Sequence, residues 1–263
     1  MTPSQPSAAL VFVAAILASG PPAAAEKARP APKPFVSVAF SAPERGTLFG
    51  DFHAPGKGAP VLLLLNGLDA GRGGWRDFAL ALSARGWGSL TIDPLGYGQS
   101  GRSLHPAAGI PGGAYGVEKD IAGALIFLAK EGIPAQRVVP VGAGDGAPIV
   151  LDYALREKDI PFVVLLSPGR DYQGLRLEGS AREFDRPMIL AAAIDDPVAL
   201  QSAEASFRSA RDKARSVVLK AKAGHGATLL KGAAGAGFAA VLFGAMEKLA
   251  RSGSPGAPDV PPR

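Results

Sequence analysis

The sequence contains no cysteine, which excludes disulfides, thiolate nucleophiles and cysteine-ligated metals. Its formal net charge is +5, but lysine and arginine are scattered, and no basic run is interleaved with aromatic residues. Nucleic acid is therefore not an expected partner. Metal-ligand spacings and phosphate- or dinucleotide-binding glycine motifs are also missing, because the GxGxG within VGAGDG is too short for a dinucleotide fingerprint. We expect no cofactor and no metal.

The two ends of the chain differ from its middle. An apolar run over 8–18 is followed by Ser19-Gly20-Pro21-Pro22 and then by three alanines before Glu26. This layout predicts a signal peptide over 1–25, and therefore a periplasmic or secreted protein, because the run is too short to span a bilayer stably. A Pro-rich linker is predicted over 26–35 and a disordered tail over 251–263.

Between these ends, strand-length apolar runs alternate with segments of helical period. The expected strands are 36–40, 47–52, 61–65, 89–92, 137–141, 162–166, 188–192 and 217–221. The expected helices are 74–85, 117–131, 147–158, 199–213 and one within 228–251. The first two strands are close enough to pair antiparallel around a turn at 43–46. The remaining alternation predicts an α/β fold with a mostly parallel sheet and helices on both faces.

Functional groups in such a sheet gather at the carboxyl ends of its strands. The segments that follow the predicted strands are Asn66-Gly67-Leu68-Asp69, DPLGYGQS over 93–100, VGAGDGA over 141–147, Ile194-Asp195-Asp196-Pro197 and Gly224-His225-Gly226. In this order, the motifs resemble those of the α/β-hydrolase family, and the resemblance covers about residues 36–250. About twenty residues separate the strands ending at Leu166 and beginning at Met188, so the resemblance is to a member without a large cap domain.

The resemblance implies an ester or amide hydrolase site at these strand ends. Asp196 stands at the family's acid position and His225 at that of its histidine. The backbone N–H groups of Leu68 and Asp145 would form the oxyanion hole. The expected ligand is a small molecule of ester or amide type.

The turn after the strand at 137–141 departs from the family pattern G-x-S-x-G. Aligning its glycines with Gly142 and Gly146 places Gly144 where the serine nucleophile belongs, and glycine has no hydroxyl to form an acyl-enzyme. A shift of one residue places Asp145 at the apex instead, as in dehalogenases and epoxide hydrolases. The first alignment keeps more of the pattern, and the second remains open.

The two alignments are compatible with several functions. We expect a weak or inactive serine hydrolase, with water activated by His225 and Asp196 as one residual route. The alternatives are hydrolysis through Asp145 and a non-catalytic protein that keeps the pocket.

Several other polar residues have plainer interpretations. His53 and His105 are expected at the surface, and Asp195 in solvent. Asp93 is expected to shape its turn, and Asp196 to cap the helix near Ala199 as well. Three serines could be considered as substitute nucleophiles, but their spacing does not support that role. They are Ser100 and Ser103 in the long loop over 93–115, and Ser167 at a strand end.

Overall fold

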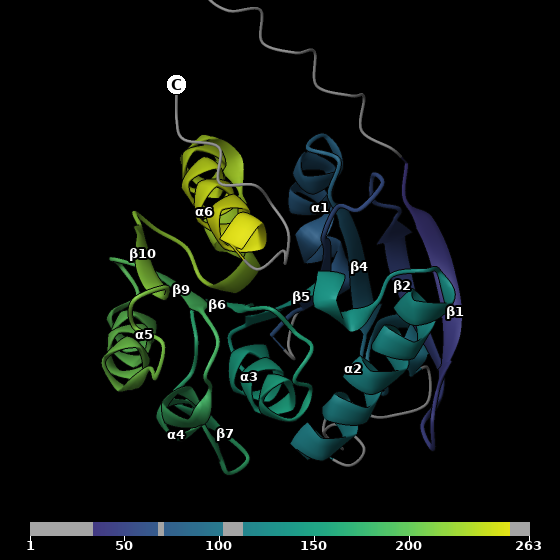
Figure 1. The fold of residues 1–263 in the computed structure, drawn as a ribbon, viewed down its shortest axis with the longest axis horizontal. Helices are drawn as coiled ribbons and strands as arrows, with labels where there is room; N and C mark the ends of the chain where they lie inside the picture. Colours follow the sequence, from purple (N-terminus) through teal and green to yellow (C-terminus); the bar gives the residue numbers. More distant parts are fainter. Residues whose placement is uncertain (1–33, 68–70, 102–112, 253–263) are drawn as a thin grey trace, which may run out of the picture.

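The computed structural model describes residues 34–67, 71–101 and 113–252, which form an eight-stranded sheet covered by helices (Figure 1). The strands lie in the order β1-β2-β4-β3-β5-β6-β9-β10. Their bounds are Val36–Ala42 (β1), Gly46–His53 (β2), Val61–Leu65 (β3), Gly88–Asp93 (β4), Val138–Ala143 (β5), Val163–Leu166 (β6), Met188–Ala193 (β9) and Val217–Ala221 (β10). The predicted α/β fold with a mostly parallel sheet is confirmed.

The antiparallel part of the sheet lies at its N-terminal edge. Strands β1 and β2 form the predicted hairpin, in which Ala42 is opposite Gly46, and β2 then pairs antiparallel with β4. All pairings from β4 to β10 are parallel. The carboxyl ends of these six strands therefore meet at one edge, where the polar motifs follow them.

The helices form two layers on opposite faces of the sheet (Figure 1). One layer contains α1 (Arg76–Ser83) and α6 (Gly232–Ser252), and the other contains α2 (Gly113–Lys130), α3 (Gly146–Arg156), α4 (Leu177–Glu183) and α5 (Pro197–Ser209). Strand β3 shows why both layers are needed. Leu62 and Leu64 point into the core beneath α1 and α6, whereas Leu63 and Leu65 point into the core beneath the other layer. Successive side chains of a strand alternate between faces, so an uninterrupted apolar run is stable only when both faces are covered.

Helix α2 differs from the prediction in its start and in its inner face. It begins at Gly113 rather than Val117. The apolar pattern predicts an inner stripe of Ile121, Leu125, Ile126 and Leu128. In the structure Ile126 is 41% exposed, while Ile121 and Leu128 are buried. The helix is apolar around most of its circumference, so its hydrophobic pattern alone does not define which side faces the sheet.

The segment between β6 and β9 contains regular elements that the sequence did not predict, but it is not a cap domain. It contains a two-stranded hairpin, β7 (Asp171–Tyr172) and β8 (Leu175–Arg176), followed by α4. Leu177 and Ala181 of α4 are buried in the core that also includes α3 and α5. The helix therefore extends the lower layer of Figure 1.

The predicted signal peptide and most of the predicted linker and tail lie outside the described residues. The helix α6 continues to Ser252, into the segment predicted as a tail. Its length and hydropathy also suit a membrane-spanning helix, yet Phe238, Leu242 and Met246 are buried against the sheet. The buried helix of a protein core can be as long and as apolar as a membrane-spanning helix.

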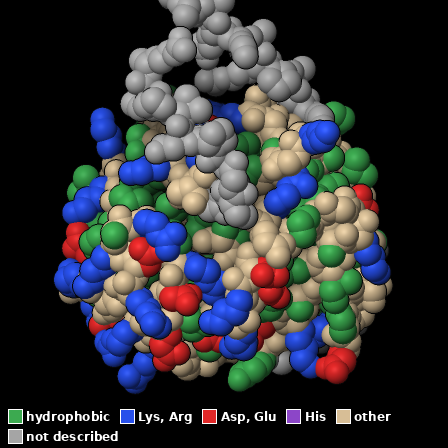
Figure 2. Space-filling model, viewed as in Figure 1, with side chains coloured by type: hydrophobic (Ala, Val, Ile, Leu, Met, Phe, Trp, Pro, Cys, Tyr) green, Lys and Arg blue, Asp and Glu red, His purple; other side chains and the backbone are tan. Residues whose placement is uncertain are grey.

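On the face drawn in Figure 2, basic and acidic side chains are intermixed.

Candidate active site

The connection between β5 and α3 bends sharply at Gly144. This residue has φ +54°, a conformation that side-chain-bearing residues adopt only with strain. Gly142 is packed so closely that an added Cβ would lie 2.5 Å from the carbonyl oxygen of Gly146. The two flanking glycines of the motif therefore meet across the bend, with Gly144 at its apex.

Asp145, the apex in the alternative alignment, has an ordinary helical conformation. Its φ of −64° and ψ of −21° make it the residue that precedes the first turn of α3. Its carboxylate lies toward the β6–β7 connection, since an added Cβ on Gly169 would be 3.7 Å from Oδ1. Burial, and then the charge of Asp145, raise the pKa of Tyr172 in β7. The residue with left-handed backbone conformation is therefore Gly144, and the geometry favours the first alignment.

Asp196 and His225 are brought together from the ends of β9 and β10. Nδ1 of His225 lies 2.6 Å from Oδ2 of Asp196, while Oδ1 of the same carboxylate accepts a hydrogen bond from the Ala199 N–H at 3.1 Å. One carboxylate oxygen thus contacts the imidazole and the other caps α5, so both roles predicted for Asp196 have a structural counterpart. Because a carboxylate accepts hydrogen bonds, Nδ1 carries the proton and Nε2 presents its lone pair.

The loop that carries His225 is held by two short-range contacts. The His225 N–H donates to Oγ1 of Thr228 at 2.8 Å, and the Thr228 hydroxyl donates back to the His225 carbonyl at 2.7 Å. Asp195, expected to be solvated, is exposed but accepts a hydrogen bond from the Gly224 N–H at 3.2 Å. These contacts fix the backbone on both sides of the imidazole.

The apex of the bend faces this imidazole. A Cβ added to Gly144 would lie 3.5 Å from Nε2 of His225, so a serine hydroxyl there would be within hydrogen-bond reach. The structure thus brings Gly144, Asp196 and His225 together, as the sequence motifs predict. Leu68, the other predicted oxyanion-hole residue, lies outside the described residues, and the role of the Asp145 N–H stays a prediction.

A cavity of about 610 Å³ opens over the bend. Its lining includes Asn66, Gly144, Ser167, Val198, His225 and Lys231. Most lining positions are small residues, so the volume is available to a ligand of modest size. In the described part of the chain, no group of three His, Cys, Asp or Glu side chains is arranged to hold a metal.

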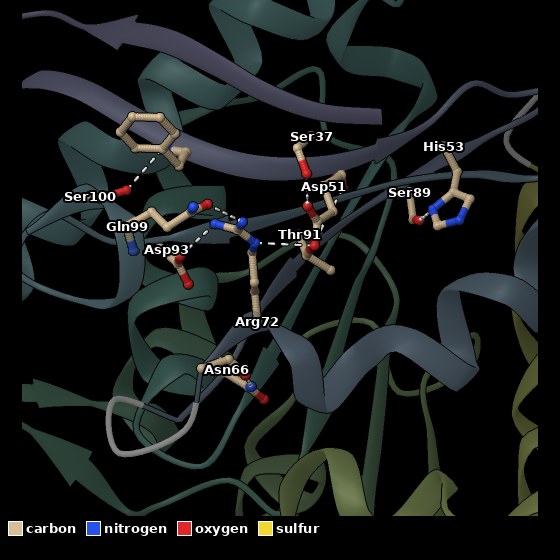
Figure 3. A network of polar contacts seen from close by, with 12 residues as sticks. Ser37, Asp51, His53, Asn66, Arg72, Ser89, Thr91, Asp93, Gln99 and Ser100 are labelled. Atoms are coloured by element: carbon tan, nitrogen blue, oxygen red, sulfur yellow. Dashed lines mark hydrogen bonds and ion pairs between the residues drawn. The ribbon is translucent and has the colours of Figure 1, made fainter. Parts of the chain in front are cut away.

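A largely covered arginine, Arg72, is the centre of a network of polar contacts beside the β3 loop (Figure 3). Arg72 directly follows the β3 loop and contacts Asp51 of β2 at 3.1 Å and Asp93 of β4 at 2.5 Å, and it also donates to Gln99. Asn66, the first residue of that loop, donates to the Gly71 carbonyl at 2.6 Å. Asn66 therefore joins the two ends of the β3 loop, and Arg72 attaches the end of this loop to β2 and β4.

The DPLGYGQS motif has a structural role in the same network. Asp93 accepts a hydrogen bond from the Gln99 N–H at 3.1 Å, which agrees with its predicted function in shaping the turn. Ser100, expected in a loop, is buried, and its Oγ accepts from the Phe49 N–H of β2 at 2.8 Å (Figure 3). This pairing to β2 could not be predicted because the two residues are far apart in sequence. Ser103 and His105 lie outside the described residues.

The prediction of a surface position for His53 was wrong. Its side chain is 2% exposed, and Nδ1 lies 3.2 Å from the Ser89 hydroxyl (Figure 3). The buried position lowers the pKa of His53, an effect that the charge of Asp51 opposes. Since β2 is an inner strand between β1 and β4, a histidine near its end is covered by neighbours that the local sequence does not reveal.

The sequence gives no signal for two residues, one near the β3 loop and one in the cavity wall. Arg72 lies in no recognised motif, and its partners come from three other segments. The spacing of Ser167 in the sequence does not indicate a nucleophile or any other role, yet this residue is fully buried and lines the cavity. Its positive φ of 45° has no sequence signal either.

The strand order, the bend at Gly144 and the paired Asp196 and His225 define an α/β-hydrolase architecture. The chain belongs to the alpha/beta hydrolase fold family, whose family model matches residues 60–226. No curated protein matches the sequence significantly.

Solved structures agree with this assignment at the level of the fold. A dienelactone hydrolase from Anabaena variabilis is 18% identical, with 81% of this chain and 97% of that chain covered and a TM-score of 0.67. The esterase domain of a Rhodothermus marinus protein is 17% identical, with 82% and 98% covered and a TM-score of 0.63. A thioesterase domain from the curacin biosynthetic pathway is 15% identical, with 80% and 100% covered and a TM-score of 0.60.

Proposed function

We propose that this protein binds small ester- or amide-type ligands in the cavity above Gly144 but forms no acyl-enzyme at that residue. It is then a weak or inactive serine hydrolase that retains the acid and the histidine. The esterase and dienelactone hydrolase structures to which the fold is similar support this ligand class. Val198 and Ala227, which line the cavity, offer apolar contact to the rest of such a ligand.

The observation that carries the proposal is the distance between the bend and the imidazole. A Cβ on Gly144 would lie 3.5 Å from Nε2 of His225, so the position of a serine nucleophile is present and its side chain is not. Acyl transfer needs a covalent bond to a side-chain oxygen, which glycine does not provide. Loss of a nucleophile leaves a residual acceleration on the order of 10³–10⁴ over water in the serine protease case.

Residual hydrolysis would use water in place of the side chain. A water molecule beside Gly144 would donate one proton to Nε2 of His225 while its oxygen attacks the ligand carbonyl. Asp196 would stabilise the imidazolium through Nδ1, and the proton would then pass to the leaving alcohol or amine. No covalent intermediate forms on this route.

Labelling with a fluorophosphonate tests the missing nucleophile. We expect no labelling of the wild-type protein and labelling of Gly144→Ser at residue 144. The variant should also hydrolyse 4-nitrophenyl acetate at least about tenfold faster than wild type, since a positioned general base contributes about 10²–10⁴-fold.

Gly144→Ala is the matched control, because it introduces the same backbone strain without a hydroxyl. It should remain as slow as wild type. An activated serine in the wild-type protein, detected by the same probe, would refute the proposal. Equal activity of the Ser and Ala variants would show that His225 does not activate a group at this position.

A further inference from the structure

Ser167 is an unusual residue in the wall of the cavity. It immediately follows β6, its side chain is 0% exposed and its backbone φ is +45°. Its Oγ is buried without a hydrogen-bond partner. Buried hydroxyls nearly always have a partner, because leaving one unsatisfied is destabilising. Strained backbone that persists beside an unsatisfied group is a feature of ligand sites.

Ser167 lies directly beside the bend at Gly144. The Gly144 N–H donates to the Leu166 carbonyl at 2.9 Å, and the Gly169 N–H approaches the Gly144 carbonyl at 3.5 Å. Gly144 is therefore bonded to the residues on both sides of Ser167. Both Gly144 and Ser167 line the cavity that also contains His225.

Several other buried serines in the described chain have hydrogen-bond partners. Ser100 accepts a hydrogen bond from Phe49, and Ser216 donates to the Asp212 carbonyl at 2.6 Å while accepting from the Met188 N–H at 3.0 Å. Of the buried side-chain atoms without a partner in the described residues, only Oγ of Ser167 belongs to a residue that lines this cavity.

We infer that the Ser167 hydroxyl is a binding group, which forms a hydrogen bond with an oxygen of the ester- or amide-type ligand beside Gly144. The inference rests on the proposed function, since it requires a ligand in this cavity. It assigns Ser167 a binding role rather than that of a nucleophile. A hydroxyl suits this role because it can donate to a carbonyl oxygen or accept from a hydroxyl or amide.

A binding role and a structural role predict opposite effects on stability. Removing a hydroxyl that has no partner in the free protein should leave the melting temperature of Ser167→Ala equal to or above that of wild type. If the hydroxyl served the fold, the same change would lower the melting temperature. The alanine keeps a Cβ at the same positive φ, so the backbone strain is unchanged.

The experiment combines thermal unfolding with ligand binding followed by ¹⁹F NMR. The probe is 1,1,1-trifluorobutan-2-one, whose hydrate resembles the tetrahedral species formed when water attacks a carbonyl. We expect Ser167→Ala to raise the Kd of this probe about two- to tenfold, as for the loss of one hydrogen bond. Ser216→Ala is the control, and it should lower the melting temperature while leaving the Kd unchanged.

Each outcome separates the inference from the proposed function. If wild type binds the probe and Ser167→Ala binds it equally well, the role of Ser167 is refuted and the proposed function stands. A lower melting temperature of Ser167→Ala refutes it as well, and fluorophosphonate labelling of Ser167 would make this residue the nucleophile. If wild type does not bind the probe, both the proposed ligand class and the role of Ser167 fail.

Discussion

Gly144 and His225 face each other across the cavity, with 3.5 Å between Nε2 of the imidazole and the place where a Cβ on Gly144 would lie. Nδ1 of the imidazole contacts Asp196, and the residue that faces Nε2 has no side chain. Under the proposed function, the site keeps a base and lacks the covalent nucleophile that active serine hydrolases combine with it. Four predictions follow from this arrangement and from the contacts that support it.

The roles of the two Asp196 oxygens, contact with His225 and capping of α5, should be separable by mutation. Asp196→Asn keeps an oxygen able to cap α5 at Ala199 but no longer offers a carboxylate to His225. In the Gly144→Ser protein, hydrolysis of 4-nitrophenyl acetate should then fall at least about 100-fold; the corresponding change in a serine protease costs about 10⁴-fold. Stability in urea should be nearly unchanged.

Asp196→Ala removes both contacts and is the matched comparison. It should lower the free energy of unfolding by about 1 kcal/mol, as is typical for loss of an N-cap. If the Asn variant is destabilised as much as the Ala variant, the capping contact is not what Asp196 contributes to stability.

Arg72 should contribute strongly to stability because one of its partners, Asp93, is buried. Arg72→Met leaves Asp93, whose side chain is 5% exposed, without its cation. We expect a loss of about 3 kcal/mol in the free energy of unfolding, measured by urea denaturation at neutral pH. Arg182→Met, which removes an exposed pair with Glu178, should have no measurable effect. Similar effects of the two changes would contradict the role of Arg72 in holding the β3 loop.

His53 should make stability dependent on pH. Burial lowers the pKa of His53 from its ordinary value of 6.5. Below that value the unfolded chain takes up a proton that the folded protein does not, so stability falls as the pH falls toward the folded-state pKa. The slope contributed by one such group is at most about 1.4 kcal/mol per pH unit.

The comparison that tests this is His53→Gln, unfolded in urea at pH 7.5 and at pH 5.5. Wild type should lose more stability between these two values than the variant does. Glu118, whose pKa burial raises, acts in the opposite direction but is present in both proteins and therefore cancels in the difference. Equal pH dependence of the two proteins would show that His53 titrates as it does in the unfolded chain.

Asp145 should not form an ester with an alkylating substrate. It precedes the first turn of α3 in a helical conformation, whereas the residue at the apex of the bend is Gly144, with its positive φ. After incubation with a 1-haloalkane or a terminal epoxide, the tryptic peptide 138–156 should keep its unmodified mass. The same peptide from fluorophosphonate-treated Gly144→Ser provides the positive control. An adduct that fragmentation places on Asp145 would restore the alternative alignment.

The strands were the most predictable elements of the fold. β3 and β10 have the predicted bounds, and the parallel order follows from alternating apolar runs and helical segments. Helix faces were less predictable, as the exposed Ile126 shows, because an apolar helix can turn several sides toward a sheet. His53 was misplaced for a related reason, since the strands that cover it are distant in sequence.

The amino-acid sequence by itself determined that position 144 has no side chain, and therefore that no acyl-enzyme can form there. It also indicated that Asp196 and His225 follow two strands whose carboxyl ends lie at one edge of the sheet, because the motifs occur in the order of the predicted strands. The tertiary structure alone decided which residue of the bend has a positive φ, how the two oxygens of Asp196 are used, and that the hydroxyl of Ser167 is left without a partner. These are properties of backbone torsion and of contacts between distant segments, which depend on how the strands and helices pack.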